Sequence, residues 1–136
     1  MIWSNAVELM TDNLQNALIG VSPKRLSNVL GKKIGAENDI YTHNQFLEVG
    51  LATGIPSLII FIVFLILLAR KCIIIGFSGN WGDTWKNKVI PLIILSLVIG
   101  NLMEALLLYH NYFSGCIFIL LAGWCVNAQC KAKNSR

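Results

Sequence analysis

Charge is scarce in this chain: Lys, Arg, Asp and Glu make up 13% of its 136 residues, whereas 55% are hydrophobic. The mean hydropathy is +0.63, which is too apolar for an ordinary soluble domain and indicates a membrane protein. The basic residues stand beside apolar runs, and no basic run is interleaved with aromatic residues as single-strand binding requires. We therefore expect membrane lipid as a partner and no nucleic acid.

Several signatures of known sites are also missing. The sequence contains no GxxxxGK[ST], HExxH or GxSxG motif. Its N-terminus lacks the basic region followed by an apolar one that defines a signal peptide. None of the four cysteines forms a CxxC pair, so we expect neither a disulfide framework nor a zinc site. We interpret them as free thiols that pack like small apolar residues; they are Cys72, Cys116, Cys125 and Cys130.

Three apolar runs dominate what is present. The run Val49–Ala69 carries no charged residue and is long enough to cross about 30 Å of hydrocarbon. Two later runs, 89–108 and 112–128, are separated by a short turn, and Glu104 is the only carboxylate inside any of the three. We predict an all-α integral membrane fold with three transmembrane helices, near 50–69, 89–108 and 112–128.

The basic residues predict the topology, because cations concentrate on the cytoplasmic side. They flank the segment between the first two runs and fill the C-terminal tail: Arg70, Lys71, Lys86, Lys88, Lys131, Lys133 and Arg136. Residues 129–136 are therefore predicted to be a basic cytoplasmic tail, residues 49–128 a three-span membrane region, and residues 1–48 an external segment.

The external segment is predicted to hold an amphipathic helix over residues 5–19 that lies on the membrane surface. Its charged side carries Glu8 and Asp12, and its apolar side carries Met10 and Leu18. The loop after it, residues 20–41, carries Lys24, Arg25, Lys32 and Lys33. These four cations can pair with a pyrophosphate or with acidic sugars. Alternatively, they are solvated or attracted to anionic headgroups.

The segment between this loop and the first span holds the strongest functional signal. Thr42 and Gln45 have the spacing of a capping box, and Tyr41 and Phe46 are placed for a hydrophobic staple. His43 would then be the first helical residue, at the membrane surface and near the positive end of the helix dipole.

His43 has two interpretations. A neutral imidazole there can accept a proton from a hydroxyl nucleophile, or the residue is a polar cap at the membrane edge. Glu48 is the competing base, but five residues further along a helix it points about 140° away. Glu104 either faces the bundle interior, near His110 or His43, or is an interfacial carboxylate that reaches headgroup water.

The segment from His43 to Pro56, HNQFLEVGLATGIP, resembles the segment that precedes an apolar span in the O-antigen ligase and O-antigen polymerase superfamily. The His-Asn pair with Gly50 and Gly54 is the most specific part. The turn Gly20–Pro23 resembles the GxGP-like turn before it, with Ser22 at the second glycine. The resemblance covers nearly the whole chain, and Asn101–Glu104 with the apolar helix after it resembles the closing two spans.

The resemblance implies part of a GT-C-type glycosyltransferase of the bacterial inner (cytoplasmic) membrane, working without a metal or cofactor. Such enzymes transfer a glycan from an undecaprenyl-pyrophosphate carrier to a sugar or lipid acceptor. It implies that His43, facing outside, is the base and that Lys24, Arg25, Lys32, Lys33, Asn44 and Glu104 contact the substrate. The family's essential arginine of an earlier external loop has no match. The chain resembles the family's C-terminal third, so we expect upstream spans to complete the enzyme.

The alternative function is non-enzymatic. Gly50 and Gly54 have GxxxG spacing, which favours close contact between helices in lipid. The chain would then be a small three-span protein that packs against a partner through these glycines, or an inactive remnant of a split gene.

Overall fold

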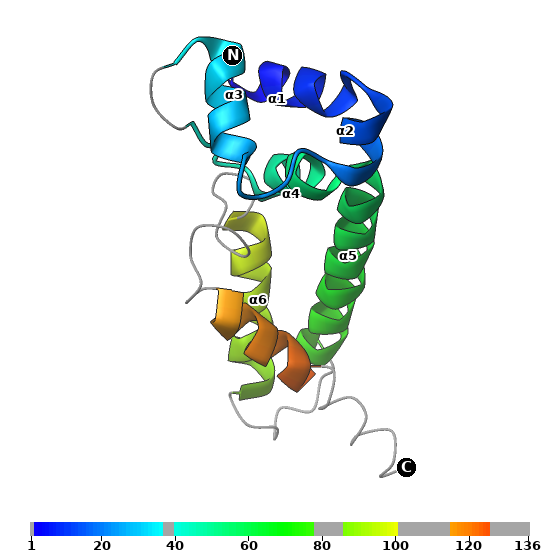
Figure 1. Cartoon of the computed structure of the whole chain (residues 1–136). Helices are drawn as coiled ribbons and strands as arrows, with labels where there is room; N and C mark the ends of the chain where they lie inside the picture. The colour runs from blue at the N-terminus through cyan, green and yellow to red at the C-terminus, as the bar shows by residue number, and fades with distance from the viewer. Residues whose placement is uncertain (1, 37–39, 78–85, 101–114, 126–136) are drawn as a thin grey trace. The chain divides into compact units, whose positions relative to one another are not determined.

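The computed structural model describes residues 2–36, 40–77, 86–100 and 115–125. Every regular element in those residues is a helix, which confirms the predicted all-α fold for them. In chain order they are α1 (Ile2–Thr11), α2 (Leu14–Ile19), α3 (Leu26–Ile34), α4 (Gln45–Thr53), α5 (Ile55–Phe77), α6 (Lys86–Gly100) and a helix over Gly115–Cys125 (Figure 1). The chain divides into two compact units: residues 1–63 with 101–105, and residues 64–100 with 106–136.

Helix α4 is the central helix of the first unit. Helices α1, α2 and α3 all pack against it, and α1 also contacts α2 and α3 (Figure 1). The apolar core between them consists of Ala6, Leu9, Leu26, Leu30, Val49, Leu51 and Ala52, each at most 8% exposed. This small helical unit therefore has its own hydrophobic core, and it contains the residues around His43.

The single amphipathic helix predicted over residues 5–19 is wrong, because the segment forms two helices. The break falls at Asn13, whose side chain accepts a hydrogen bond from the Asn16 backbone N–H at 2.7 Å and caps α2. Short polar side chains of this kind compete with helix continuation and favour a cap. Asn16 Nδ2 in turn donates to the Leu9 carbonyl at 3.1 Å, which ties the two helices together.

The loop predicted over residues 20–41 is also partly wrong, because it contains α3. Leu26 and Leu30, four residues apart, share the buried face of this helix, as the helical period requires. Gly35 ends α3 in the left-handed conformation, with φ 74°, and its N–H bonds back to the last turn, which is a common way for helices to stop.

The first predicted span begins too early. Helix α4 ends at Thr53, Gly54 has φ 86°, and α5 starts at Ile55. A Cβ on Gly54 would lie 2.5 Å from the backbone of Leu18. Reciprocally, a Cβ on Gly20 would lie 2.5 Å from the backbone at the end of α4. The ends of α2 and α4 are therefore in direct backbone contact, which only glycine allows at these two positions.

The loop before α3 completes this junction. The N–H groups of Val21 and Ser22 donate to the carbonyls of Leu51 and Ala52 at 2.7 and 3.2 Å. In an uninterrupted helix the Ala52 carbonyl would need an N–H from Pro56, which proline lacks. Pro56 instead falls in the first turn of α5, where a missing N–H is tolerated. The N–H groups of this loop thus bond to the carbonyls at the end of α4 that the following residues do not reach.

Gly50 has a different neighbour. A Cβ there would lie 2.6 Å from Met10 Sδ and 3.2 Å from Leu58, so this glycine allows α1 to approach α4. Gly50 and Gly54 therefore contact other parts of the same chain, and the break at Gly54 keeps the pair off a single continuous transmembrane helix. A partner contact through this pair stays a prediction.

Among the described residues, one helix is long and apolar enough to cross a membrane: Ile55–Gly76, with 22 residues and a hydropathy of 2.9. It overlaps the predicted span near 50–69 but starts and ends later in the chain, and its crossing of a membrane stays a prediction. The helices Val89–Gly100 and Gly115–Cys125 are apolar but shorter. They are the described parts of the runs predicted at 89–108 and 112–128, and the rest of both runs lies outside the described residues.

The second unit packs aromatic and thiol side chains between its helices. Phe64 of α5 meets Phe118 edge-on, with ring centroids 6.4 Å apart. Cys72 and Cys125 are buried free thiols, while Cys116 is free and exposed. The interpretation of the cysteines as free thiols that pack like small apolar residues is confirmed for Cys72 and Cys125 and is wrong for Cys116, which is exposed. Cys130 and the basic tail at 129–136 lie outside the described residues.

Candidate functional site

The turn before α4, residues 42–44, is the centre of the candidate site. Asn44 is the N-cap of α4: its side-chain oxygen accepts hydrogen bonds from the backbone N–H groups of Phe46 at 3.0 Å and Leu47 at 3.2 Å. The prediction that Thr42 is the N-cap is therefore wrong by two residues, and the helix begins at Gln45. Asparagine is as strong a cap as threonine or stronger, so the shift follows from side-chain chemistry.

His43 is consequently outside the helix rather than its first residue. Its φ is 50°, in the left-handed region that costs most residues about 1–2 kcal/mol but that Asn, Asp and His enter more readily than others. Its side chain is exposed, while Thr42 and Asn44 on either side are buried, at 2% and 9% exposure. The turn therefore exposes the His43 imidazole between two buried residues.

Thr42 is contacted from two helices. Trp3 Nε1, from α1, donates to the Thr42 carbonyl at 2.8 Å. The Thr42 hydroxyl lies 3.3 Å from Glu48 Oε1 of α4 and 3.1 Å from the Asn44 carbonyl. The Asn44 N–H donates to the same hydroxyl oxygen at 3.4 Å. Segments far apart in the sequence thus meet at the residue that precedes His43.

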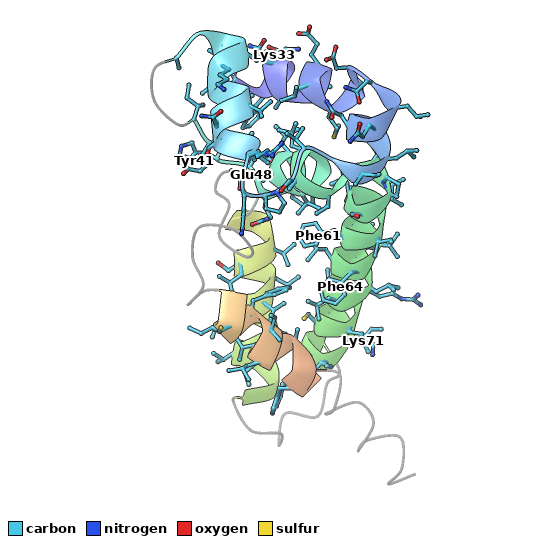
Figure 2. The ribbon with its side chains drawn as sticks, in the orientation of Figure 1. Lys33, Tyr41, Glu48, Phe61, Phe64 and Lys71 are labelled. Atoms are coloured by element: carbon cyan, nitrogen blue, oxygen red, sulfur yellow. The ribbon has the colours of Figure 1, made fainter. Side chains whose placement is uncertain are left out.

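The first turns of α4 bury polar side chains. Gln45 and Glu48 are both 0% exposed, and Glu48 lies beneath α3 and beside the turn in Figure 2. Phe46 meets Phe61 of α5 at a tilt of 58°, with ring centroids 5.8 Å apart, and the staple expected between Tyr41 and Phe46 stays a prediction. Because Glu48 is enclosed, it does not compete with His43 for contact with a substrate in this conformation.

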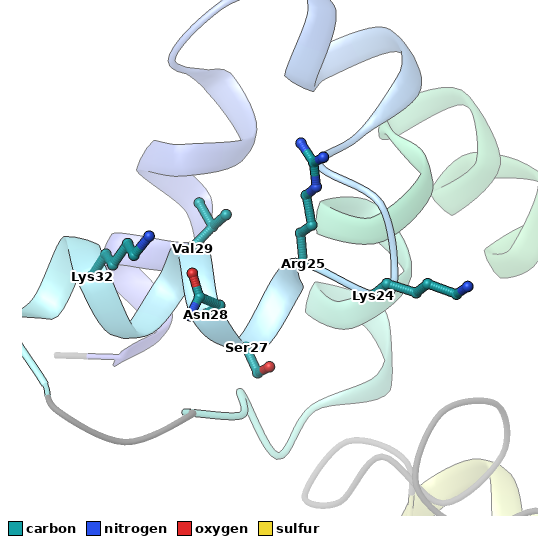
Figure 3. Close-up of a pocket in the computed structure, with 6 residues that line it drawn as sticks. All are labelled: Lys24, Arg25, Ser27, Asn28, Val29 and Lys32. Atoms are coloured by element: carbon teal, nitrogen blue, oxygen red, sulfur yellow. The ribbon is translucent and has the colours of Figure 1, made fainter.

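Three of the four predicted cations gather at one pocket. Its volume is about 580 Å³, and it is lined by Lys24, Arg25, Ser27, Asn28, Val29 and Lys32 (Figure 3). The three cations are exposed: Lys24 and Arg25 directly precede α3, and Lys32 lies in its last turn. The fourth, Lys33, forms an ion pair with Glu8 of α1 at 3.2 Å (Figure 2), so it joins two helices of the unit. The pocket has net positive charge and two neutral hydrogen-bonding side chains, a combination suited to phosphate or carboxylate groups.

Sequence reasoning found His43 and the cations but missed Trp3 and treated Glu48 only as a rival base. The Trp3 contact joins residues 39 positions apart, and no local pattern encodes it. The side-chain oxygen of Asn44 accepts the two capping hydrogen bonds, and its substrate contact stays a prediction. Glu104 and His110 lie outside the described residues. Within the described ranges no group of three or more His, Cys, Asp or Glu side chains is placed to hold a metal ion.

None of the protein-family models, characterised proteins or solved structures compared with this chain matches it. Its function is therefore argued from its own residues.

Proposed function

We propose that this chain is the C-terminal part of an O-antigen ligase-like or polymerase-like glycosyltransferase of a bacterial cytoplasmic membrane. It would transfer a glycan from an undecaprenyl-pyrophosphate carrier to a sugar or lipid acceptor. The observation that carries the proposal is the exposed His43 imidazole on a turn whose neighbouring residues are buried. That turn belongs to the same compact unit as the cationic pocket and the beginning of the apolar helix α5.

In this reaction an acceptor hydroxyl oxygen attacks the anomeric carbon of the donor glycan. The new glycosidic bond forms as the bond from that carbon to the pyrophosphate oxygen breaks, and the hydroxyl proton passes to the His43 imidazole. General-base help of this kind contributes about 10²–10⁴ in rate. Lys24, Arg25 and Lys32 would hold the pyrophosphate, whose negative charge grows as it leaves.

The turn at residues 20–23 supports the resemblance behind this proposal. The family pattern has a glycine where this chain has Ser22, and Ser22 has φ 86°. That conformation is normal for glycine and uncommon for serine. The backbone at this position is thus of the kind that the glycine of the pattern would adopt without strain, although the side chain differs.

The membrane setting of the proposal rests on α5. Its exposed side chains are apolar along nearly its whole length, including Ile60 at 70% and Ile66 at 60%, and such a surface is stable when surrounded by hydrocarbon. We propose three spans, with the cytoplasmic C-terminus and external His43 segment that the flanking charges predict.

The test uses three substitutions of His43 in the bacterium that carries this chain, with the chromosomal copy deleted and variants supplied at equal expression. Asn and Gly both tolerate positive φ, whereas Ala does not, and none of the three can act as the base. If His43 is the base, His43→Asn, His43→Gly and His43→Ala all accumulate the lipid-linked glycan and lose the transferred product by at least about 100-fold.

The matched control is Gln15→Ala, an exposed residue of α2 in the same unit, which should transfer glycan at the wild-type level. Full transfer by His43→Asn and His43→Gly, with loss only in His43→Ala, would show that His43 is needed for the backbone conformation of the turn and not as the base. Unchanged lipid-linked glycan in the deletion strain itself would contradict the enzymatic proposal and favour the non-enzymatic partner of a membrane complex.

A further inference from the structure

We propose that Trp3 and Glu48 are positioning residues for His43, which they hold in place through Thr42. The inference rests on the proposed role of His43 as the reactive group. It assigns a role in glycan transfer to two residues that do not themselves reach the substrate.

The two peptide planes on either side of His43 each take part in a hydrogen bond that involves Thr42. The plane before it contains the Thr42 carbonyl, which accepts from Trp3 Nε1 at 2.8 Å. The plane after it contains the Asn44 N–H, which donates to the Thr42 hydroxyl oxygen at 3.4 Å. Two fixed planes define φ and ψ of the residue between them, so these contacts determine the direction in which the imidazole leaves the backbone.

Glu48 acts on the second of these contacts. A hydroxyl has one proton to donate and two lone pairs that accept. The proton of the Thr42 hydroxyl has two acceptors within reach, Glu48 Oε1 at 3.3 Å and the Asn44 carbonyl at 3.1 Å. Donation to either leaves the lone pairs to receive the Asn44 N–H, and Glu48 is the acceptor that ties this hydroxyl to α4. Thr42 and Glu48 are 2% and 0% exposed, so bulk water is not at hand to replace the carboxylate, and a lost partner inside the unit is not readily compensated.

These contacts matter because the left-handed conformation of His43, although more accessible to histidine than to most residues, is still not the preferred one. Its φ of 50° is disfavoured by about 1–2 kcal/mol for most residues, so the surrounding contacts must hold it. A base also has to stay within about 0.5 Å of its productive position, and a displacement of about 1 Å can lower a rate about 100-fold. Contacts that fix the backbone of His43 thus bear directly on the rate of transfer.

Paired substitutions separate the hydrogen bond from the shape of each side chain. Thr42→Val removes the hydroxyl and keeps the branched shape, and Thr42→Ser keeps the hydroxyl. Glu48→Met removes the acceptor, and Glu48→Gln keeps an acceptor oxygen at similar length. Trp3→Phe removes the N–H donor together with part of the ring, and because this ring is half-exposed the lost volume puts folding at little risk.

The first measurement does not depend on enzymatic activity. The full chain has two histidines, so imidazole NMR signals of the chain in lipid nanodiscs report His43 with His110 as the internal reference. We expect Thr42→Val, Glu48→Met and Trp3→Phe to shift the His43 signals and to raise its rate of modification by diethyl pyrocarbonate several-fold relative to His110. Thr42→Ser and Glu48→Gln should restore the wild-type values.

The second measurement is glycan transfer, where the first three variants should lower kcat about 10- to 100-fold with KM within about twofold. Unchanged His43 signals in a folded Trp3→Phe variant, together with unchanged signals in Thr42→Val, overturn the positioning role whatever the activity. Shifted signals that the conservative variants restore support it. If those shifts occur in a chain whose transfer does not respond to His43 substitution, positioning stands and the proposed function fails.

Discussion

Helices α4 and α5 are neighbours in sequence, separated by Gly54 alone, yet α4 buries polar side chains whereas α5 exposes large apolar ones. Helix α4 encloses Gln45 and Glu48 completely, whereas α5 leaves Ile60 and Ile66 at 70% and 60% exposure. In water, charged residues are almost never fully buried unless paired, and large apolar patches are rarely left open. This contrast supports the proposal that α4 and α5 lie in different surroundings, with the change beginning at Gly54.

The difference shows what each region needs for stability. The first unit has its own core, capped helices and a polar cluster whose hydrogen bonds hold the His43 turn. Helix α5 has no internal means of covering its isoleucines and depends on hydrocarbon or on other helices around it. The candidate site thus lies in a unit with a core of its own, and that unit includes the beginning of the apolar helix α5.

The largest expected effect comes from charging the exposed surface of α5. Ile66 and Leu67 are near the middle of the helix, and at that depth replacing an apolar residue by lysine costs about 3–4 kcal/mol. Together, Ile66→Lys and Leu67→Lys should disfavour insertion by about 6–8 kcal/mol. We expect cysteines placed at Ile55 and Gly76, the two ends of the apolar helix, in a chain without other cysteines, to label from opposite sides before the change and from one side after it.

The matched control places the same charges on α2. Leu14 and Leu18 are 75% and 53% exposed, comparable with the two residues of α5. If the first unit lies outside the hydrocarbon, Leu14→Lys with Leu18→Lys should leave the labelling pattern unchanged. If both pairs of substitutions change the labelling pattern equally, the proposed difference between the two regions is wrong. If neither pair changes it, α5 does not lie in a membrane.

The second prediction concerns the boundary. Gly54→Ala places a Cβ 2.5 Å from the Leu18 backbone at a φ of 86°, and backbone does not give way as a flexible side chain does. We expect the free energy of unfolding to fall by about 3 kcal/mol, measured by denaturant titration of the full chain in detergent. Gly35→Ala is the control: its φ is 74° but nothing lies within 4 Å of the new Cβ, so it should lose only about 1 kcal/mol. Equal losses would mean that close packing at the boundary adds nothing.

The sequence predicted the apolar helix well but not where it starts. Residues 49–53 are as apolar as those after them, and a buried helix of a small unit cannot be told from the start of a span by composition alone. The signal that separates them is Gly54 followed by Pro56, together with the donors from Val21 and Ser22, which lie about thirty residues earlier in the chain. Helix α3 was missed for a related reason, since one pair of leucines among glycines and lysines gives too short a pattern to define a helix.

The candidate site was predictable in its residue types and unpredictable in its geometry. An isolated histidine before an apolar run, and four cations in one segment, are visible in the sequence. That His43 lies outside the helix depended on which of Thr42 and Asn44 caps α4, and both are good caps. The contact of Thr42 with Trp3 depends on the packing of α1 against α4, which exists only in the folded unit.

The smallest expected effect is a gain in stability at Ser22. This residue donates its N–H to the Ala52 carbonyl at the end of α4 while its own φ is 86°. Ser22→Gly keeps that hydrogen bond and removes about 1–2 kcal/mol of backbone strain, from which the greater freedom of glycine in the unfolded chain subtracts about 0.4–1 kcal/mol. We expect the free energy of unfolding to rise by about 0.5–1 kcal/mol in the same titration.

Ser27→Gly is the control for Ser22→Gly, because Ser27 lies inside α3, where glycine should lower the free energy of unfolding by about 0.5–1 kcal/mol. A gain in the free energy of unfolding at Ser22 with a loss at Ser27 would show that the backbone at Ser22 is strained and that glycine relieves the strain. A loss at both positions would mean that Ser22 contributes more through its side chain than its backbone conformation costs. In that case serine would be the better residue for this turn, and the turn would no longer support the resemblance to the GxGP-like pattern.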